Sequence, residues 1–145
     1  MQQIIYDSRG GNTRKLADAI AEELEAEAVD VSVTATVPGT GVLFLGSGYY
    51  GGKPGKNILK FIETHDFRGR RVALFGTSGG GKGLEVEAMA EALKGKGATV
   101  IGKYYCSGQF LLFVSQGHPN VTDLDAARKF AREMAGLQKQ PPVGA

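Results

Sequence analysis

Six consecutive residues, which read Ser-Arg-Gly-Gly-Asn-Thr at positions 8–13, have the composition of an anion-binding turn. The two glycines allow the backbone to curl its N–H groups inward, Ser8 and Thr13 add hydroxyl groups, and Asn12 is suited to cap a following helix. The first N–H groups of a helix have no internal partner and lie at the positive end of its dipole, so a phosphate is favoured there. An ordinary strand-to-helix turn is the alternative, because Gly and Asn are common in such turns.

The segments on either side of this turn predict how it is positioned. Residues 3–6 are mostly Ile and Tyr, which suit a strand. After the turn, apolar residues recur at helical spacing, namely Leu16, Ala17, Ile20 and Leu24. The turn is therefore expected where a strand ends and a helix begins.

Strand and helix patterns alternate about five times along the chain. Strands are expected at residues 3–6, 28–33, 42–45, 71–75 and 98–101, the last continued or paired by residues 110–114. Further helices are expected around Ile58 to Ile62, Leu84 to Leu93, where Gly95 ends the helix, and Leu124 to Leu137, where Thr122 and Asp125 resemble a capping box. The connection from the second strand to the third is too short for a full helix, so a bare loop is expected. This alternation predicts an α/β fold with a parallel sheet and helices on both faces, over one domain at residues 1–137 with a frayed tail at 138–145.

Glycine-rich loops follow three of the expected strands, and glycine makes up 22 of the 145 residues. In such sheets ligands bind beyond the carboxyl ends of the strands. The loop after the first strand offers a phosphate site, residues 46–55 offer the adjacent Tyr49 and Tyr50, and residues 76–83 offer mostly backbone. A ligand with a phosphate at one end and a flat ring system at the other would suit all three loops. Core packing is the alternative for the two tyrosines.

Two further segments match nucleotide-binding motifs, but each match is incomplete. Residues 46–51 match the dinucleotide fingerprint, but Pro54 interrupts the helix that should begin at once. Residues 76–83 match the phosphate-loop pattern until Gly83, which stands where a Ser or Thr should bind magnesium. Lys82 is therefore interpreted as a solvated surface charge.

From residue 3 to residue 136, the order of these segments resembles the flavodoxin family. The phosphate loop of that family commonly reads Thr/Ser-x-Thr-Gly-Asn-Thr. Residues 8–13 keep the first hydroxyl, the Gly, the Asn and the final Thr, with Gly10 in place of the middle hydroxyl. Residues 117–120, followed by an acidic helix start, look like flavodoxin-family proteins of anaerobes. The resemblance implies a flavodoxin-like three-layer sandwich whose five parallel strands have the order 2-1-3-4-5.

The resemblance also implies that the chain binds flavin mononucleotide (FMN). Its phosphate would lie in the turn at residues 8–13, a tyrosine after the third strand would contact the flavin ring, and the loop after the fourth strand would approach the pyrimidine side. Family flavodoxins usually have a second aromatic residue in that last loop, and its absence here leaves the outer ring face open. The residues implied to bind FMN are Ser8, Arg9, Gly10, Gly11, Asn12, Thr13, Ser47, Gly48, Tyr49, Tyr50, Gly51, Thr77, Ser78, Gly79 and Gly80.

Composition narrows the classes of partner. A net charge of +2 with interspersed acids and bases does not suggest nucleic-acid binding. No apolar run approaches the roughly 20 residues that span a bilayer, and the polar first residues predict no signal peptide.

The single Cys106 fits a reducing cytoplasm and is interpreted as structural, and His118 is interpreted as a capping or packing residue. The sequence shows no catalytic triad and no metal-ligand pattern.

The sequence thus predicts an FMN-binding electron-transfer protein of the cytoplasm, monomeric or weakly dimeric, that serves redox partner proteins it does not identify. An FMN-dependent NAD(P)H oxidoreductase acting on a quinone or similar acceptor is the first alternative, because an open ring face would admit a nicotinamide. A flavin-free interaction domain on the same fold is the second alternative. The near-neutral charge speaks mildly against an acidic carrier, since strong charge assists steering to partners.

Overall fold

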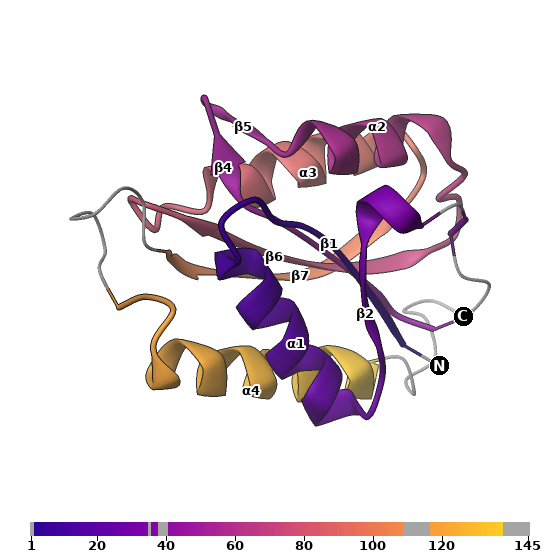
Figure 1. The fold of residues 1–145 in the computed structure, drawn as a ribbon. Helices are drawn as coiled ribbons and strands as arrows, with labels where there is room; N and C mark the ends of the chain where they lie inside the picture. Colours follow the sequence, from indigo (N-terminus) through magenta and orange to yellow (C-terminus); the bar gives the residue numbers. More distant parts are fainter. Residues whose placement is uncertain (1, 35, 38–40, 109–116, 138–145) are drawn as a thin grey trace.

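The computed structural model describes residues 2–34, 36–37, 41–108 and 117–137 of the protein (Figure 1). Five parallel strands form one sheet in the order β2-β1-β3-β6-β7, which confirms the predicted order 2-1-3-4-5. These strands are β1 (Gln3–Asp7), β2 (Ala28–Asp30), β3 (Leu43–Ser47), β6 (Arg71–Ser78) and β7 (Thr99–Ser107). The helices are α1 (Asn12–Leu24), α2 (Lys56–Thr64), α3 (Leu84–Lys94) and α4 (Val121–Leu137).

Helices cover both faces of the sheet, so the molecule has the three layers that the sequence predicts (Figure 1). The pair α1 and α4 lies on one face, and the pair α2 and α3 lies on the other. Successive strand residues alternate between the faces: Ile4 and Phe44 pack in the α1–α4 core, whereas Ile5 and Leu45 pack in the α2–α3 core. Burial on both faces explains why the central strands are nearly continuous apolar runs.

The second strand is shorter than predicted. It ends at Asp30, whose Oδ1 accepts the backbone N–H of Ser32 at 2.8 Å. This contact turns the chain into a short 3-10 helix, η1 (Val31–Val33), which takes the place of the second half of the predicted strand. The strand predicted at residues 28–33 was therefore too long, because a local side-chain contact competes with strand pairing.

A small hairpin occupies the loop predicted at residues 46–55. In it, β4 (Tyr49–Tyr50) pairs with the antiparallel β5 (Lys53–Pro54). The two residues between them, Gly51 and Gly52, have φ values of 59° and 86°, which glycine adopts without strain. The hairpin holds both tyrosines in fixed backbone positions at one end of the sheet.

The last two strands are longer than predicted. The strand expected at residues 71–75 continues to Ser78, and the strand expected at 98–101 runs from Thr99 to Ser107. Pairing between these two strands extends to Ser78 and Ser107, which places part of the predicted glycine-rich loop inside the sheet. The predicted continuation at residues 110–114 and the predicted tail at 138–145 lie outside the described residues.

The capping box of α4 lies two residues earlier than predicted. The backbone N–H of Asp123 donates to Oδ1 of Asn120 at 2.9 Å, and the N–H of Asn120 donates to Oδ2 of Asp123 at 2.8 Å. The Thr122–Asp125 box was wrong, since Asp125 instead pairs with Arg128. His118 contacts the same cap, with Nδ1 2.7 Å from Oδ2 of Asp123.

We predict that Gly46→Ala destabilises the fold, because a Cβ at this buried position of β3 would overlap the ring of Phe75 on β6. Urea unfolding should show a loss of about 1–3 kcal/mol, the usual cost of overpacking a core. Gly95→Ala is the control, since nothing lies near its Cβ position and its φ is −72°. The double variant with Phe75→Leu should lose less than the sum of the two single variants; simple additivity would contradict the proposed overlap.

Candidate functional site

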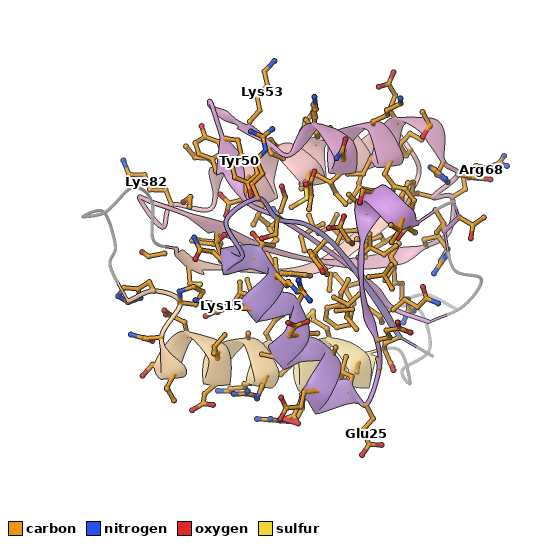
Figure 2. All side chains as sticks on the ribbon, viewed as in Figure 1. Lys15, Glu25, Tyr50, Lys53, Arg68 and Lys82 are labelled. Atoms are coloured by element: carbon orange, nitrogen blue, oxygen red, sulfur yellow. The ribbon has the colours of Figure 1, made fainter. Side chains whose placement is uncertain are left out.

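The carboxyl ends of β1, β3, β6 and β7 meet at one end of the sheet, where their loops enclose a cavity of about 260 Å³. Figure 2 shows Tyr50 and Lys82 at this end of the molecule and Arg68 at the opposite end. The cavity is smaller than the roughly 300–1,000 Å³ of typical ligand pockets, so a mononucleotide would extend beyond it. The residues that line it are Arg9, Gly10, Asn12, Gly48, Tyr49, Tyr50, Thr77, Ser78, Gly79 and Gly108.

Nine of these ten lining residues belong to the fifteen that the sequence predicts as cofactor-binding. Sequence reasoning missed Gly108, although it follows the fifth strand at the same end of the sheet, and the rule that ligands lie at strand carboxyl ends could have found it. Six predicted residues do not line the cavity. Of these, Ser8, Gly11, Thr13 and Ser47 support its walls, and Gly51 and Gly80 are exposed.

The turn between β1 and α1 is closed by Ser8. Its Oγ accepts the backbone N–H of Gly11 at 3.2 Å and that of Arg14 at 3.3 Å. Gly11 is the cap residue of α1 with φ of 91°, so the predicted capping role of Asn12 was wrong. Asn12 is the first helical residue, and its side chain instead lies against Gly108.

The amino terminus of α1 differs electrostatically from those of the other three helices in the described part of the chain. Its first turn holds no acidic residue, and Arg14 and Lys15 are exposed there. The other three helix starts each have a carboxylate nearby, from Asp7 for α2, Glu85 and Glu87 for α3, and Asp123 for α4. The positive end of the α1 dipole is therefore not neutralised by an acid, which favours an anion in the adjacent cavity.

A buried pair of hydroxyl groups connects the start of α1 to the end of β6. Oγ1 of Thr13 lies 2.8 Å from Oγ1 of Thr77, and both side chains are buried. Hydrogen bonds of this kind are costly to leave unmade in an interior, so the pair fixes the distance between the start of α1 and the end of β6. Ser78 continues the same wall, since its Oγ accepts the N–H of Gly81 at 3.0 Å and its carbonyl oxygen accepts the N–H of Gly108 at 2.9 Å.

Two buried polar residues hold the hairpin side of the cavity. Oγ of Ser47 accepts the N–H of Gly55 and donates to the carbonyl oxygen of Gly48, both at 2.8 Å. Oδ2 of Asp7 accepts the N–H of Ile58 at 3.0 Å and so caps α2 from the end of β1. The strand ends thus provide fixed supports on which the hairpin rests.

Tyr50 links the hairpin directly to the anion-binding turn. Its hydroxyl oxygen accepts the backbone N–H of Arg9 at 2.9 Å, and the Arg9 guanidinium carbon lies 4.4 Å from the centre of its ring. Burial raises the pKa of Tyr50, partly opposed by the Arg9 hydrogen bond, so the phenol stays protonated at neutral pH. Tyr49 and Tyr50 are both half-buried at the cavity, which disfavours the core-packing alternative.

The two competing nucleotide motifs do not have the backbone that they require. Gly46 and Ser47 lie within β3 and lead to a strand of the hairpin, not to a helix. Gly76 and Thr77 lie within β6, so no phosphate loop forms there, and Lys82 is exposed. Both dinucleotide and phosphate-loop hypotheses are therefore disfavoured.

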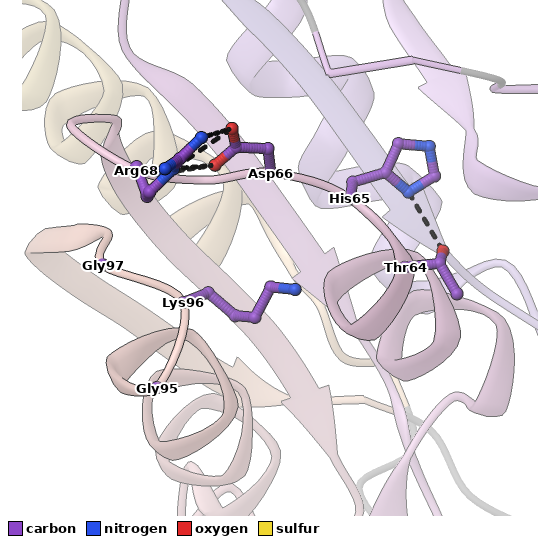
Figure 3. Close-up of a pocket in the computed structure, with 7 residues that line it drawn as sticks. All are labelled: Thr64, His65, Asp66, Arg68, Gly95, Lys96 and Gly97. Carbon is purple, nitrogen blue, oxygen red and sulfur yellow. Dashed lines mark hydrogen bonds and ion pairs between the residues drawn. The ribbon is translucent and has the colours of Figure 1, made fainter.

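A larger cavity of about 560 Å³ lies at the opposite end of the sheet, near the ends of α2 and α3 (Figure 3). Arg68 is paired with Asp66 at 2.9 Å, a contact that holds the pKa of Asp66 at about 2, and Nζ of Lys96 donates to the carbonyl oxygen of Glu63. These cations are already engaged, and helix carboxyl ends repel anions. This cavity is therefore a poor phosphate site.

Among the residues that the structure describes, no cluster of three or more His, Cys, Asp or Glu side chains could hold a metal ion. None of the described helices is long and apolar enough to cross a lipid bilayer.

Comparison with known proteins agrees with this geometry. Residues 3–112 match the model of the flavodoxin domain family. The uncharacterized protein MJ0298 of Methanocaldococcus jannaschii is 30% identical over 143 residues, which cover 90% of this chain and 95% of that protein. The flavodoxin-like domain-containing protein BilS of Clostridioides difficile is 28% identical over 116 residues, which cover 73% of this chain and 65% of that protein.

Solved structures show the same fold. A flavodoxin from the domain Archaea has a TM-score of 0.78 at 20% identity, covering 97% of this chain and 100% of that one. Oxidised flavodoxin 1 of Bacillus cereus has a TM-score of 0.74 at 21% identity, with coverage of 97% and 99%. Rubredoxin oxygen:oxidoreductase of Desulfovibrio gigas has a TM-score of 0.73 at 17% identity, with coverage of 95% of this chain and 36% of that one. The fold and the cavity define a flavodoxin-like protein, and the chain belongs to the flavodoxin family.

Cys106 is predicted to react slowly in the folded protein. Its side chain is buried on β7, and burial, with a smaller effect of the Asp123 charge, raises the pKa of its thiol to about 12. At pH 8 the thiolate population should fall on the order of 1,000-fold relative to an ordinary cysteine. Reaction with Ellman's reagent in native buffer, compared with guanidinium-unfolded protein, measures this. A Thr64→Cys variant in a Cys106→Ser background gives the rate of an exposed thiol; an equal rate for native Cys106 would contradict the burial.

Proposed function

We propose that the protein binds FMN in the cavity at the carboxyl ends of its strands and carries electrons between partner proteins. The observation that supports this most strongly is the amino terminus of α1, which faces the cavity without an acidic residue. It is the one described helix start with no carboxylate, and the half-buried tyrosines lie across the cavity from it.

The residues present fit the parts of FMN in turn. Backbone N–H groups of the turn at residues 8–13 would hold the phosphate, and the Ser8 hydroxyl that now accepts two of them would exchange those bonds for the ligand. Tyr49 and Tyr50 would contact the flavin ring, and the backbone of Thr77 to Gly79 would form the opposite wall. These positions are the ones implied by the resemblance to flavodoxins, and their binding role stays a prediction.

The bound flavin would supply the redox chemistry, and the chain would supply position and electrostatics. The Thr13–Thr77 contact and the Arg9–Tyr50 hydrogen bond would fix the phosphate loop relative to both ring loops. The neutral Tyr50 phenol adds no charge beside the ring. Nothing in this arrangement requires an acid, base or nucleophile, which suits a carrier.

An FMN-dependent NAD(P)H oxidoreductase remains the second candidate. The loop after β6 lacks the second aromatic residue that the resemblance to flavodoxins leads us to expect, and this would leave the outer ring face open to a nicotinamide. A cytoplasmic location and unidentified redox partner proteins, with a monomeric or weakly dimeric chain, complete the proposal. The flavin-free domain is disfavoured by the positive helix terminus at the cavity.

Asn12→Asp should separate phosphate binding from folding. An acid in the first turn of α1 stabilises the helix by about 0.3–1 kcal/mol. The same charge at the cavity wall should weaken FMN binding on the order of ten-fold or more through repulsion of the phosphate. Fluorescence titration with FMN and with riboflavin, which lacks the phosphate, measures the effect.

Asn57→Asp is the matched control, because it adds the same charge to the first turn of α2 at an exposed position that does not line the cavity. Its FMN affinity should stay within about two-fold of the unmodified protein, as expected for a screened surface charge. Equal losses of FMN and riboflavin affinity in Asn12→Asp would contradict a phosphate site at α1.

The carrier and the reductase differ in their direct electron donor. We predict that excess NADH or NADPH alone leaves the FMN-loaded protein oxidised for minutes under anaerobic conditions, whereas dithionite bleaches it at once. The absorbance of the flavin measures both. Rapid bleaching by either nicotinamide would support the reductase and exclude the carrier.

A further inference from the structure

Glu85 is a buried carboxylic acid to which the proposed electron carrier assigns no role. It lies in the first turn of α3 and is fully buried, with 0% of its surface exposed. Within the described part of the chain, neither of its carboxylate oxygens has a hydrogen-bond partner on another residue. A buried charge without a partner is expensive, so such a group binds a proton more readily than an exposed glutamate does.

The position of Glu85 relates it to the cavity. Its carboxyl group lies against Gly76 of β6, where the absent side chain leaves the room that the carboxyl fills. The next residue along β6 is Thr77, which lines the cavity. Gly76 also pairs with Ser47 of β3, the residue that supports the hairpin. Glu85 therefore lies directly behind the wall formed by the ends of β3 and β6.

No buried cation compensates this acid within the described part of the chain. On the neighbouring elements, Lys53 of β5 and the lysines of α2 are exposed, and Lys103 of β7 is paired with Glu87. The buried Cys106 of β7 is close enough for the Glu85 charge to act on its thiol, and the buried Asp7 of β1 caps α2. Burial raises the pKa of Glu85, opposed to a lesser extent by its own backbone N–H.

We propose that Glu85 is a proton-binding group coupled to the cavity: it takes up a proton when negative charge is added to the flavin. This inference rests on the proposed FMN site. A bound flavin that accepted two electrons and one proton would carry one more negative charge beside this wall. In the fraction of molecules whose Glu85 carboxylate is still ionised, this added charge favours binding of a second proton from solvent to Glu85, so up to two protons accompany the two electrons. Charges inside a protein interact strongly enough for this coupling because the interior screens them weakly.

The first experiment needs no flavin. In the apoprotein, an acid whose pKa is raised by folding lowers stability as the pH increases from its unfolded pKa to its folded one. Urea unfolding of Glu85→Gln should therefore show a growing advantage over the unmodified protein as pH rises above about 4.3, the ordinary glutamate pKa. Within that window the ratio of the two unfolding constants should change by up to about ten-fold per pH unit. Glu91→Gln, an exposed acid on the same helix, should show no such trend.

The second experiment uses the FMN-loaded protein reduced with dithionite, with proton uptake taken from the pH dependence of the two-electron midpoint potential. Between pH 6 and pH 9 the unmodified protein and Glu91→Gln should take up as many as twice the protons per two electrons that Glu85→Gln does. Equal uptake in all three proteins at every pH would overturn the proposal even if FMN binds well. Failure to bind FMN would instead overturn the proposed function, and the pH dependence of apoprotein stability would still report the burial of Glu85.

Discussion

The positive end of α1 is the constraint on which the site depends. A helix start is attractive to an anion only if its N–H groups are accessible and no nearby carboxylate neutralises them. Here β1 delivers the chain to the centre of the sheet, Gly11 turns it with a φ of 91°, and the helix begins at Asn12 beside the cavity. The buried Thr13–Thr77 contact then holds this terminus at a set distance from the end of β6.

The acids around the loops are distributed so that this terminus stays positive. Asp7 comes directly before the turn, yet its carboxylate faces the other side of the sheet and caps α2. Asp123 closes the box at the start of α4, and Glu85 is buried behind Gly76 on the α2–α3 side. Each carboxylate therefore serves a neighbouring element or the opposite face, and the α1 side of the cavity keeps its attraction for phosphate. The proposed electron carrier follows from this distribution together with the tyrosines of the hairpin.

The alternation of strand and helix patterns predicts the α/β class and the end of the sheet at which the loops meet, and the resemblance to flavodoxins adds the strand order and most of the cavity lining. Apolar strands alternating with amphipathic helices leave few topologies, and strand carboxyl ends then bring the glycine-rich loops together. The predictions that were wrong concern the end of one strand and the cap of one helix. Asp30 shortens the second strand through a contact two residues away, and Asn120 displaces Thr122 as the cap of α4 because its partner Asp123 reaches back to it. The support roles of Ser47 and Asp7 depend on neighbours eight and 51 residues away, which no short pattern contains.

We propose that the α1 terminus binds the phosphate of FMN as a dianion. Phosphorus NMR of the FMN complex tests it directly, because a free phosphate monoester titrates with a pKa near 6. We expect the bound resonance to be displaced from that of free FMN and to stay constant from about pH 5 to pH 8, since the helix terminus favours the doubly charged form. A bound resonance that titrates as free FMN does would contradict the account.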